Sequence, residues 1–127
     1  MKKDPRPRRI LVVDDEACVR EYVSDVLASR GHVVDQASSC LDAVFRLFQD
    51  RYDVLILDLL FPDVSGLFLY EQARRISADL AGRILFMTGC DESHPLVRKA
   101  RETPAPILFK PFSRSGVLDL VEEHFRE

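Results

Sequence analysis

Residues 9–16 read RILVVDDE, an apolar segment that runs directly into three carboxylates. A strand exposed on one face would alternate apolar and polar residues, so the unbroken apolar run at 10–13 predicts a strand buried on both faces. Asp14, Asp15 and Glu16 repel one another, and burying them is costly unless a cation or hydrogen bonds compensate their charge. The end of this strand is therefore a candidate functional site.

The length and charge of the chain narrow its class. A chain of 127 residues fits one domain with a full core, which we place at residues 9–127 behind a flexible basic lead-in at residues 1–8. The net charge of -3 and the isoelectric point near 5.6 argue against direct nucleic-acid binding by the whole chain.

The cysteines and the hydropathy of the chain indicate in which cellular compartment the protein resides. The three cysteines are odd in number and widely spaced, which argues against a disulfide framework or a zinc site and suits a reducing cytoplasm. No apolar run approaches the roughly 20 residues of a membrane span, and the start of the chain lacks the features of a signal peptide. We therefore expect a cytoplasmic protein that makes no membrane contact.

Strand and helix patterns alternate along the chain. After the first strand, short apolar runs predict strands at 33–37, 53–58, 83–89 and 106–109. Apolar residues at three-and-four spacing predict helices at 16–32, 38–51, 65–77 and 113–125, with a weaker helix at 91–104. Each parallel connection needs a crossover, so this order predicts an α/β, doubly wound (βα)5 domain with a parallel five-stranded sheet.

Polar residues follow the strands at the edge where such folds bind ligands. They are Asp14, Asp15, Asp58, Thr88 and Lys110. Each alone has an ordinary explanation as a helix cap, a turn residue or a solvated charge, but their common position at one edge favours a site. The carboxylates suit Mg²⁺, and Asp58 is placed to attack a phosphoryl group whose charge Mg²⁺ and Lys110 would stabilise.

Four sequence blocks resemble the receiver domains of two-component response regulators. The blocks are ILVVDDE, LILDLLFPDVSG, FMTG and KPF, and the spacing between them also fits the family over essentially the whole chain. The resemblance implies a flavodoxin-like sheet with strand order 2-1-3-4-5. It also implies that Asp58 is the phosphoacceptor and that Mg²⁺ is bound by Asp15, Asp58 and the backbone carbonyl of Leu60, with Asp14 acting through a water molecule.

The resemblance assigns roles to the remaining site residues. Thr88 would contact the phosphoryl group, and Lys110 would pair with it, next to a cis Lys110–Pro111 bond. Many family members carry an aromatic residue three positions before the lysine, whereas this chain has Ile107. Phe109 lies on the same side of the predicted strand as Ile107.

The implied function is signalling rather than enzymatic catalysis. A histidine kinase or phosphotransfer protein would phosphorylate Asp58, and the added charge would change the binding of a downstream protein. That protein would contact the face formed by residues 91–104, 106–109 and 113–125, and a homodimer is a further alternative.

Three other functions compete with this interpretation. A Mg²⁺-dependent phosphohydrolase of the haloacid dehalogenase type needs an aspartate two residues after the nucleophile, where Leu60 stands. A flavin-binding flavodoxin-like protein needs a phosphate loop after the first strand, where the acidic residues 14–16 would repel the phosphate. An unphosphorylated docking module is the third. Six phenylalanines are assigned to the core or to helix packing: Phe45, Phe48, Phe61, Phe68, Phe86 and Phe112.

Overall fold

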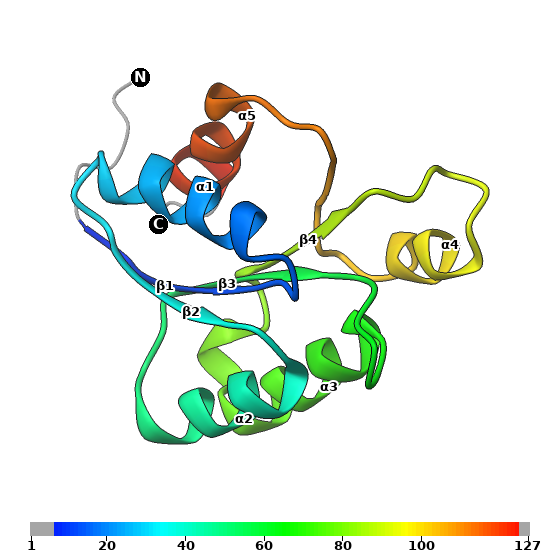
Figure 1. Ribbon diagram of the computed structural model, residues 1–127. Coiled ribbons are helices and arrows are strands. Elements are labelled where there is room, and N and C mark those ends of the chain that lie inside the picture. Colours follow the sequence, from blue (N-terminus) through cyan, green and yellow to red (C-terminus); the bar gives the residue numbers. More distant parts are fainter. Residues whose placement is uncertain (1–6, 125–127) are drawn as a thin grey trace.

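The computed structural model describes residues 7–124 and contains a five-stranded parallel sheet (Figure 1). The strand order is β2-β1-β3-β4-β5, which confirms the predicted fold class and order. The strands are β1 (Arg9–Val13), β2 (Val33–Ala37), β3 (Val54–Asp58), β4 (Ile84–Thr88) and β5 (Ile107–Phe109).

The first strand is buried on both faces, as its unbroken apolar run predicts. Ile10 and Val12 point into one apolar cluster, whereas Leu11 and Val13 point into the other. β1 pairs with β2 on one side and with β3 on the other, so its end lies directly beside the end of β3. This pairing brings the acidic residues that follow the two strands together.

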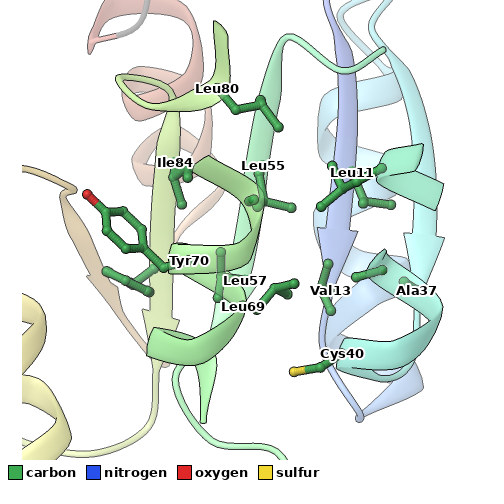
Figure 2. Packing of buried hydrophobic residues seen from close by; sticks show 14 of the residues in the cluster. Leu11, Val13, Ala37, Cys40, Leu55, Leu57, Leu69, Tyr70, Leu80 and Ile84 are labelled. Atoms are coloured by element: carbon green, nitrogen blue, oxygen red, sulfur yellow. The ribbon is translucent and has the colours of Figure 1, made fainter. Parts of the chain in front are cut away.

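The helices cover both faces of the sheet (Figure 1). One face packs against α1 and α5, and the other against α2, α3 and α4, where leucines, alanines and Tyr70 fill the space between helices and strands (Figure 2). The helices are α1 (Ala17–Ala28), α2 (Cys40–Gln49), α3 (Gly66–Ile76), α4 (Pro95–Arg101) and α5 (Arg114–Asp119), with a short 3₁₀ turn, η1, at Ala78–Leu80.

Serine side chains begin three of the helices. Ser39, Ser65 and Ser113 each accept a hydrogen bond from a backbone N–H in the first turn of α2, α3 and α5. Gly31 follows α1 with a φ of 87°, a left-handed conformation in which glycine meets no Cβ penalty. These residues explain why the helix boundaries lie close to the predicted ones.

Three helices differ from the predicted ranges by three or more residues at one end, and the first of them is α1, which ends at Ala28 rather than at residue 32. The weak helix expected at 91–104 is only α4, because Pro95 occupies its first turn and the His94 ring accepts a hydrogen bond from the Leu96 N–H. The last helix changes from α-helical to π-helical geometry, so that α5 is followed by the π segment η2 (Leu120–His124).

The assignment of all six phenylalanines to packing positions is wrong for three of them. Phe86 is fully buried, and Phe61 and Phe112 pack against the two clusters, but Phe45, Phe48 and Phe68 are exposed. Helical spacing groups residues on one side of a helix but does not say whether that side faces the sheet.

The ends of the chain lie largely outside the described residues. The lead-in at residues 1–8 is described only for Pro7 and Arg8, and the Arg8 N–H donates to His32 Nδ1 at 3.0 Å. Within residues 7–124, no helix combines the length and the apolar character that crossing a bilayer requires.

Candidate functional site

Three aspartates meet at the carboxyl edge of the sheet. Asp14 follows β1 directly, and Asp58 is the last residue of β3. Asp14, Asp15 and Asp58 each offer one carboxylate oxygen, and these oxygens lie within 4.8 Å of one another. Asp14 and Asp58 are buried and Asp15 is exposed, so the cluster opens to solvent on the Asp15 side.

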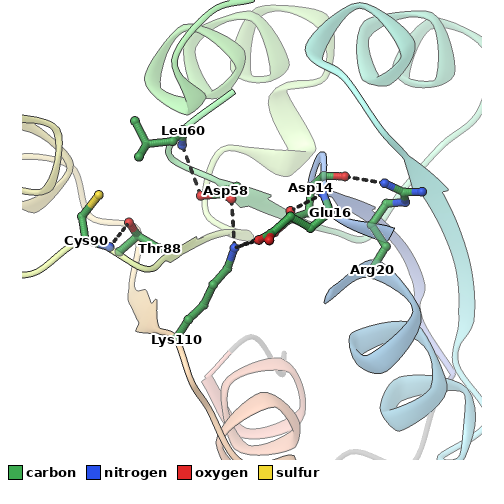
Figure 3. Close-up of polar contacts among 8 residues, drawn as sticks. All are labelled: Asp14, Glu16, Arg20, Asp58, Leu60, Thr88, Cys90 and Lys110. Atoms are coloured by element: carbon green, nitrogen blue, oxygen red, sulfur yellow. Dashed lines mark hydrogen bonds and ion pairs between the residues drawn. The ribbon is translucent and has the colours of Figure 1, made fainter. Parts of the chain in front are cut away.

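Lys110 reaches into this cluster from the end of β5 (Figure 3). Its Nζ donates to Asp14 Oδ2 at 2.9 Å and to Asp58 Oδ2 at 3.0 Å. Glu16 Oε1 lies 3.6 Å from the same nitrogen. The ammonium group thus compensates part of the negative charge that the junction at residues 14–16 concentrates. The Lys110–Pro111 peptide bond is cis, as expected.

Backbone amides hold the other oxygens of the two buried carboxylates. The Glu16 N–H donates to Asp14 Oδ1 at 2.9 Å, and the Leu60 N–H donates to Asp58 Oδ1 at 3.2 Å. Each carboxylate is therefore held by a backbone amide on one oxygen and by Lys110 on the other, which fixes its orientation.

Burial and charge shift the pKa values of Asp58 and Lys110. Burial raises the pKa of Asp58 above its usual range, and the neighbouring Asp14 carboxylate adds to this, while the Lys110 hydrogen bond opposes both. For Lys110, burial acts to lower the pKa, but the hydrogen bonds to Asp14 and Asp58 outweigh it and raise the pKa above its usual value. Lys110 therefore stays charged at neutral pH.

Thr88 ends β4 and is fully buried. Its Oγ1 accepts a hydrogen bond from the Cys90 N–H at 3.0 Å, and its carbonyl accepts one from the Lys110 N–H at 2.7 Å. The hydroxyl serves the local turn in this structure, and it retains a proton that it can donate. The backbone bond places β4 and the Lys110 segment side by side.

The structure brings together Asp14, Asp15, Asp58 and Lys110, as the sequence predicts. Leu60 adjoins the cluster through its N–H, and the metal-binding role of its carbonyl stays a prediction.

Sequence reasoning missed three residues around the site. Glu16 belongs to the acidic run, but the sequence does not predict its contact with Lys110. Arg20 Nη1 donates to the Asp14 carbonyl oxygen at 2.7 Å, and its Nε donates to Gln36 on β2. Gly66 begins α3 against the backbone of Asp58, whose carbonyl oxygen would lie 2.1 Å from a Cβ at position 66. Nothing in the local sequence pattern points to the Arg20 contact, because its partner is a backbone carbonyl six residues away.

Ile107 occupies the position on β5 at which an aromatic residue is expected, and it packs against the core. Ile107 and Phe109 both contact the cluster beneath α3 and α4, which confirms that they share one face of the strand. The Arg101 guanidinium of α4 lies 5.6 Å from the centre of the Phe109 ring. Phe109 rather than Ile107 is thus the aromatic residue that links β5 to α4.

This arrangement can support two kinds of chemistry. Clustered carboxylate oxygens are the ligands that hard divalent cations prefer. A carboxylate next to a fixed ammonium group can also act as a nucleophile toward a phosphoryl group, because the ammonium stabilises the oxygens that carry the developing charge.

A family model described as the response regulator receiver domain matches residues 10–122. The response regulator MprA of Mycobacterium ulcerans is 34% identical over 110 residues, which make up 87% of this chain and 47% of MprA. The transcriptional regulatory protein DltR of Streptococcus agalactiae is 29% identical over 119 residues, which make up 94% of this chain and 52% of DltR. The chain thus spans about half the length of the curated relatives it matches.

Solved structures show the same fold. The response regulator TrrA of Thermotoga maritima, in complex with Mg²⁺-BeF, is 30% identical with a TM-score of 0.75, over 90% of this chain and 96% of TrrA. A Burkholderia pseudomallei response regulator with a phosphorylated aspartic acid, a calcium ion and citrate is 25% identical with a TM-score of 0.80, over 92% of this chain and 68% of that one. A CheY-like receiver from Methanospirillum hungatei has a TM-score of 0.84 at 21% identity, over 94% of both chains.

Proposed function

The chain belongs to the response regulator receiver domains, and from this premise we propose that it accepts a phosphoryl group on Asp58 with the help of Mg²⁺. The observation that carries the proposal is the Asp58 carboxylate itself, held 3.0 Å from Lys110 Nζ within a cluster of three aspartates. Of two related structures, one contains Mg²⁺-BeF and the other a phosphorylated aspartic acid.

Each side chain of the site has its own role in phosphoryl transfer. An Asp58 oxygen forms a bond to phosphorus while the bond between phosphorus and the donor atom breaks, and the donor leaves with that electron pair. Lys110 neutralises charge on the transferred oxygens, and Thr88, whose Oγ1 accepts a hydrogen bond from the Cys90 N–H, donates a hydrogen bond from its hydroxyl to one of them. Bound Mg²⁺, held by Asp15, Asp58 and the Leu60 carbonyl, with Asp14 acting through water, would supply further positive charge to the same oxygens.

The test of this proposal is the intact mass of the protein after incubation with acetyl phosphate and Mg²⁺. We expect the wild type to gain one phosphoryl group, and we expect no gain in Asp58→Asn or without Mg²⁺. No gain by the wild type under any condition would refute the proposal and favour an unphosphorylated docking module.

Mg²⁺ is expected to stabilise the folded protein through Asp15. At a free Mg²⁺ concentration about ten times the dissociation constant, binding to the folded state alone adds about 1.4 kcal/mol to the free energy of unfolding. Asp15→Asn should remove this gain, yet it should barely change the metal-free protein, because Asp15 is exposed.

Thermal unfolding with and without Mg²⁺ measures both effects. Asp25→Asn is the matched control, because Asp25 is an exposed aspartate on α1. An equal Mg²⁺ shift in the wild type and Asp15→Asn would show that the ion is held without Asp15.

An apolar groove next to Lys110 is available for binding a protein phosphodonor. A cavity of about 390 Å³ lies between α1 and the segment after β5, lined by Cys18, Val19, Tyr22, Lys110, Pro111 and Phe112. The rings of Tyr22 and Phe112 lie 6.3 Å apart within it. A histidine kinase or phosphotransfer protein that packs a helix into this groove would bring its phosphohistidine close to Asp58.

Tyr22→Ala is expected to separate protein donors from small-molecule donors. Phosphotransfer from a kinase or phosphotransfer protein should slow about tenfold, because a half-exposed aromatic anchor is lost from the docking groove. The rate with acetyl phosphate should stay unchanged, since Tyr22 does not contact the carboxylates. Stopped reactions followed by intact mass measure both rates, with Val33→Ala as an exposed control, and equal slowing with both donors would contradict the docking role.

The output of the domain is proposed to leave through α4, β5 and α5. Phosphorylation adds nearly two negative charges next to Thr88 and Lys110, which are joined by a backbone hydrogen bond. Phe109 precedes Lys110 and contacts Arg101 on α4, so a shift of this segment is passed directly to α4.

A further inference from the structure

Arg20 lies in the first turn of α1, and its side chain returns to the end of β1 (Figure 3). Its Nη1 donates to the Asp14 carbonyl oxygen at 2.7 Å, and its Nε donates to Gln36 Oε1 on β2 at 3.2 Å. Both acceptors are neutral, and within residues 7–124 Arg20 forms no ion pair, although the acidic residues 14–16 are close in sequence. The guanidinium therefore holds the backbone instead of neutralising a carboxylate.

Asp15 is the aspartate of the cluster whose side chain is not held directly. Asp14 and Asp58 are each fixed by a backbone amide and by Lys110. The Asp15 carboxylate is exposed and has no hydrogen bond or ion pair to any residue between 7 and 124. Its direction therefore depends on the backbone that carries it.

The contact of Arg20 is with that part of the backbone. The Asp14 carbonyl oxygen belongs to the planar peptide group that leads into Asp15. On the strand side, the Asp14 N–H donates to the Ala37 carbonyl at 3.2 Å and fixes the residue to β2. A hydrogen bond to the carbonyl oxygen fixes the orientation of the peptide plane on the other side, and so the direction in which Asp15 leaves it.

The start of α1 gives this loop little other support. Side chains cap the first turns of α2, α3, α4 and α5, whereas the residue that precedes α1, Glu16, forms no side-chain capping bond. A helical side chain points back toward the start of its helix, which lets Arg20 reach the loop from within α1. A hydrogen bond from a charged donor is also among the stronger ones in proteins.

We propose that Arg20 is a positioning residue for the Mg²⁺ site: by holding the Asp14 carbonyl, it directs the Asp15 carboxylate toward the ion. This inference rests on the proposed function, in which Asp15 binds Mg²⁺. Gln36 acts one step further away, because it orients the guanidinium through Nε. Replacing a residue that orients a metal ligand typically weakens metal binding by about 10- to 100-fold.

The charge of Arg20 acts in the opposite direction to its hydrogen bonds. Figure 3 shows Arg20 and Lys110 on opposite sides of Asp14, so Arg20 is a second cation near the cluster. A nearby cation repels Mg²⁺, and its removal alone would make Mg²⁺ bind more tightly. Loss of positioning would make Mg²⁺ bind more weakly, so the sign of the change separates the two effects.

Isothermal titration of the full chain with MgCl₂, without a phosphodonor, measures this sign. Arg20→Met should raise the Kd for Mg²⁺ about tenfold. Arg20→Lys should also raise it, because an ammonium group keeps the charge but lacks the fork that reaches both acceptors. Arg75→Met is the matched control, an exposed arginine at the end of α3 whose loss should change the Kd less than about twofold.

Gln36→Ala is a second variant that leaves Arg20 in place. It should raise the Kd for Mg²⁺ about threefold, and it should add nothing to Arg20→Met, because both act through one series of contacts. Thermal unfolding without Mg²⁺ checks that each variant folds. At saturating Mg²⁺, Arg20→Met should be phosphorylated by acetyl phosphate within about twofold of the wild-type rate, since Arg20 contacts no carboxylate oxygen of the site.

The outcomes distinguish this inference from the proposed function. If the wild type binds Mg²⁺ and folded Arg20→Met binds it equally or more tightly, the positioning role is overturned and the proposed function stands. If the wild type binds no Mg²⁺, both are overturned. Additive effects of Gln36→Ala and Arg20→Met would overturn the link through Gln36.

Discussion

Gly66→Ala is expected to lower the free energy of unfolding by about 4 kcal/mol, because the new methyl group has no room. A Cβ at this position would lie 2.1 Å from the Asp58 carbonyl oxygen and 2.9 Å from Leu59 Cα. Both are backbone atoms at the end of the strand that carries the proposed phosphoacceptor, Asp58, so the contact cannot be relieved by moving a flexible side chain. The Gly66 N–H also donates to the Leu59 carbonyl at 2.8 Å, which holds the two segments together.

The same substitution should also damage the acidic site. Relief of the clash moves the backbone at Asp58, and its carboxylate then loses its position relative to Lys110 Nζ. We expect loss of the Mg²⁺-induced stabilisation and a fall in phosphorylation by acetyl phosphate of about hundredfold, since small misplacements of reacting groups have such effects.

Urea denaturation and intact mass measure the two effects of Gly66→Ala. Gly82→Ala is the control, because a Cβ at Gly82 meets nothing within 4 Å and its φ is not positive. We expect Gly82→Ala to change the free energy of unfolding by less than about 1 kcal/mol. A Gly66→Ala protein with the stability and phosphorylation rate of the Gly82→Ala protein would disprove the steric argument.

The fold was predictable because each level of the sequence agrees with the others. The unbroken apolar run at 10–13 requires cover on both faces, and the helices between strands supply that cover. Parallel strands then collect their carboxyl ends at one edge, so Asp14, Asp58 and Lys110 converge although they are far apart in sequence. The position of the site follows from strand order alone.

Other features depend on directions that periodicity does not contain. Leu41, Phe45 and Phe48 have the spacing of a packing stripe, but they lie on the flank of α2 rather than beneath it. The contact of Arg20 with the Asp14 carbonyl depends on how far α1 rotates about its axis. If α1 were rotated by the angle between two successive residues, Arg20 would point elsewhere, although the sequence pattern would be unchanged.

The close approach of Gly66 to β3 also cannot be predicted from the sequence. Within LFPDVSG the glycine reads as a turn residue that precedes a helix. Only the path of the loop shows that the start of α3 returns to touch the backbone of Asp58. The glycine is needed for the distance between two chain segments, and a local pattern carries no information on that distance.

Lys110→Met is expected to lower the free energy of unfolding by about 3 kcal/mol at neutral pH without Mg²⁺, because it removes the cation between two buried carboxylates. The Asp14 side chain is fully buried and the Asp58 side chain is 8% exposed. Methionine keeps the length of the side chain, so the loss reports the charge rather than packing. The rate of phosphorylation by acetyl phosphate should fall about hundredfold, since one fixed donor to the transferred oxygens is gone.

The pH dependence of this loss has a definite sign. Burial already raises the pKa of Asp58, and without Lys110 it should rise further. A carboxyl group whose pKa is raised by folding contributes stability at low pH that is lost as the pH rises through the folded pKa. The destabilisation by Lys110→Met should therefore be large near pH 7 and much smaller near pH 4, and Mg²⁺ should reduce it at pH 7 by replacing the missing positive charge.

Urea denaturation at both pH values, with and without Mg²⁺, distinguishes this account from a loss of packing around Lys110. Lys99→Met on α4 is the control, an exposed lysine whose replacement should change the free energy of unfolding by less than about 0.5 kcal/mol at either pH. If Lys110→Met were equally destabilising at both pH values and with Mg²⁺, its role would be packing. If instead the loss disappears at low pH and with Mg²⁺, Lys110 and the metal neutralise the same carboxylates. The stability of the metal-free domain then depends on the residue that is proposed to assist phosphoryl transfer.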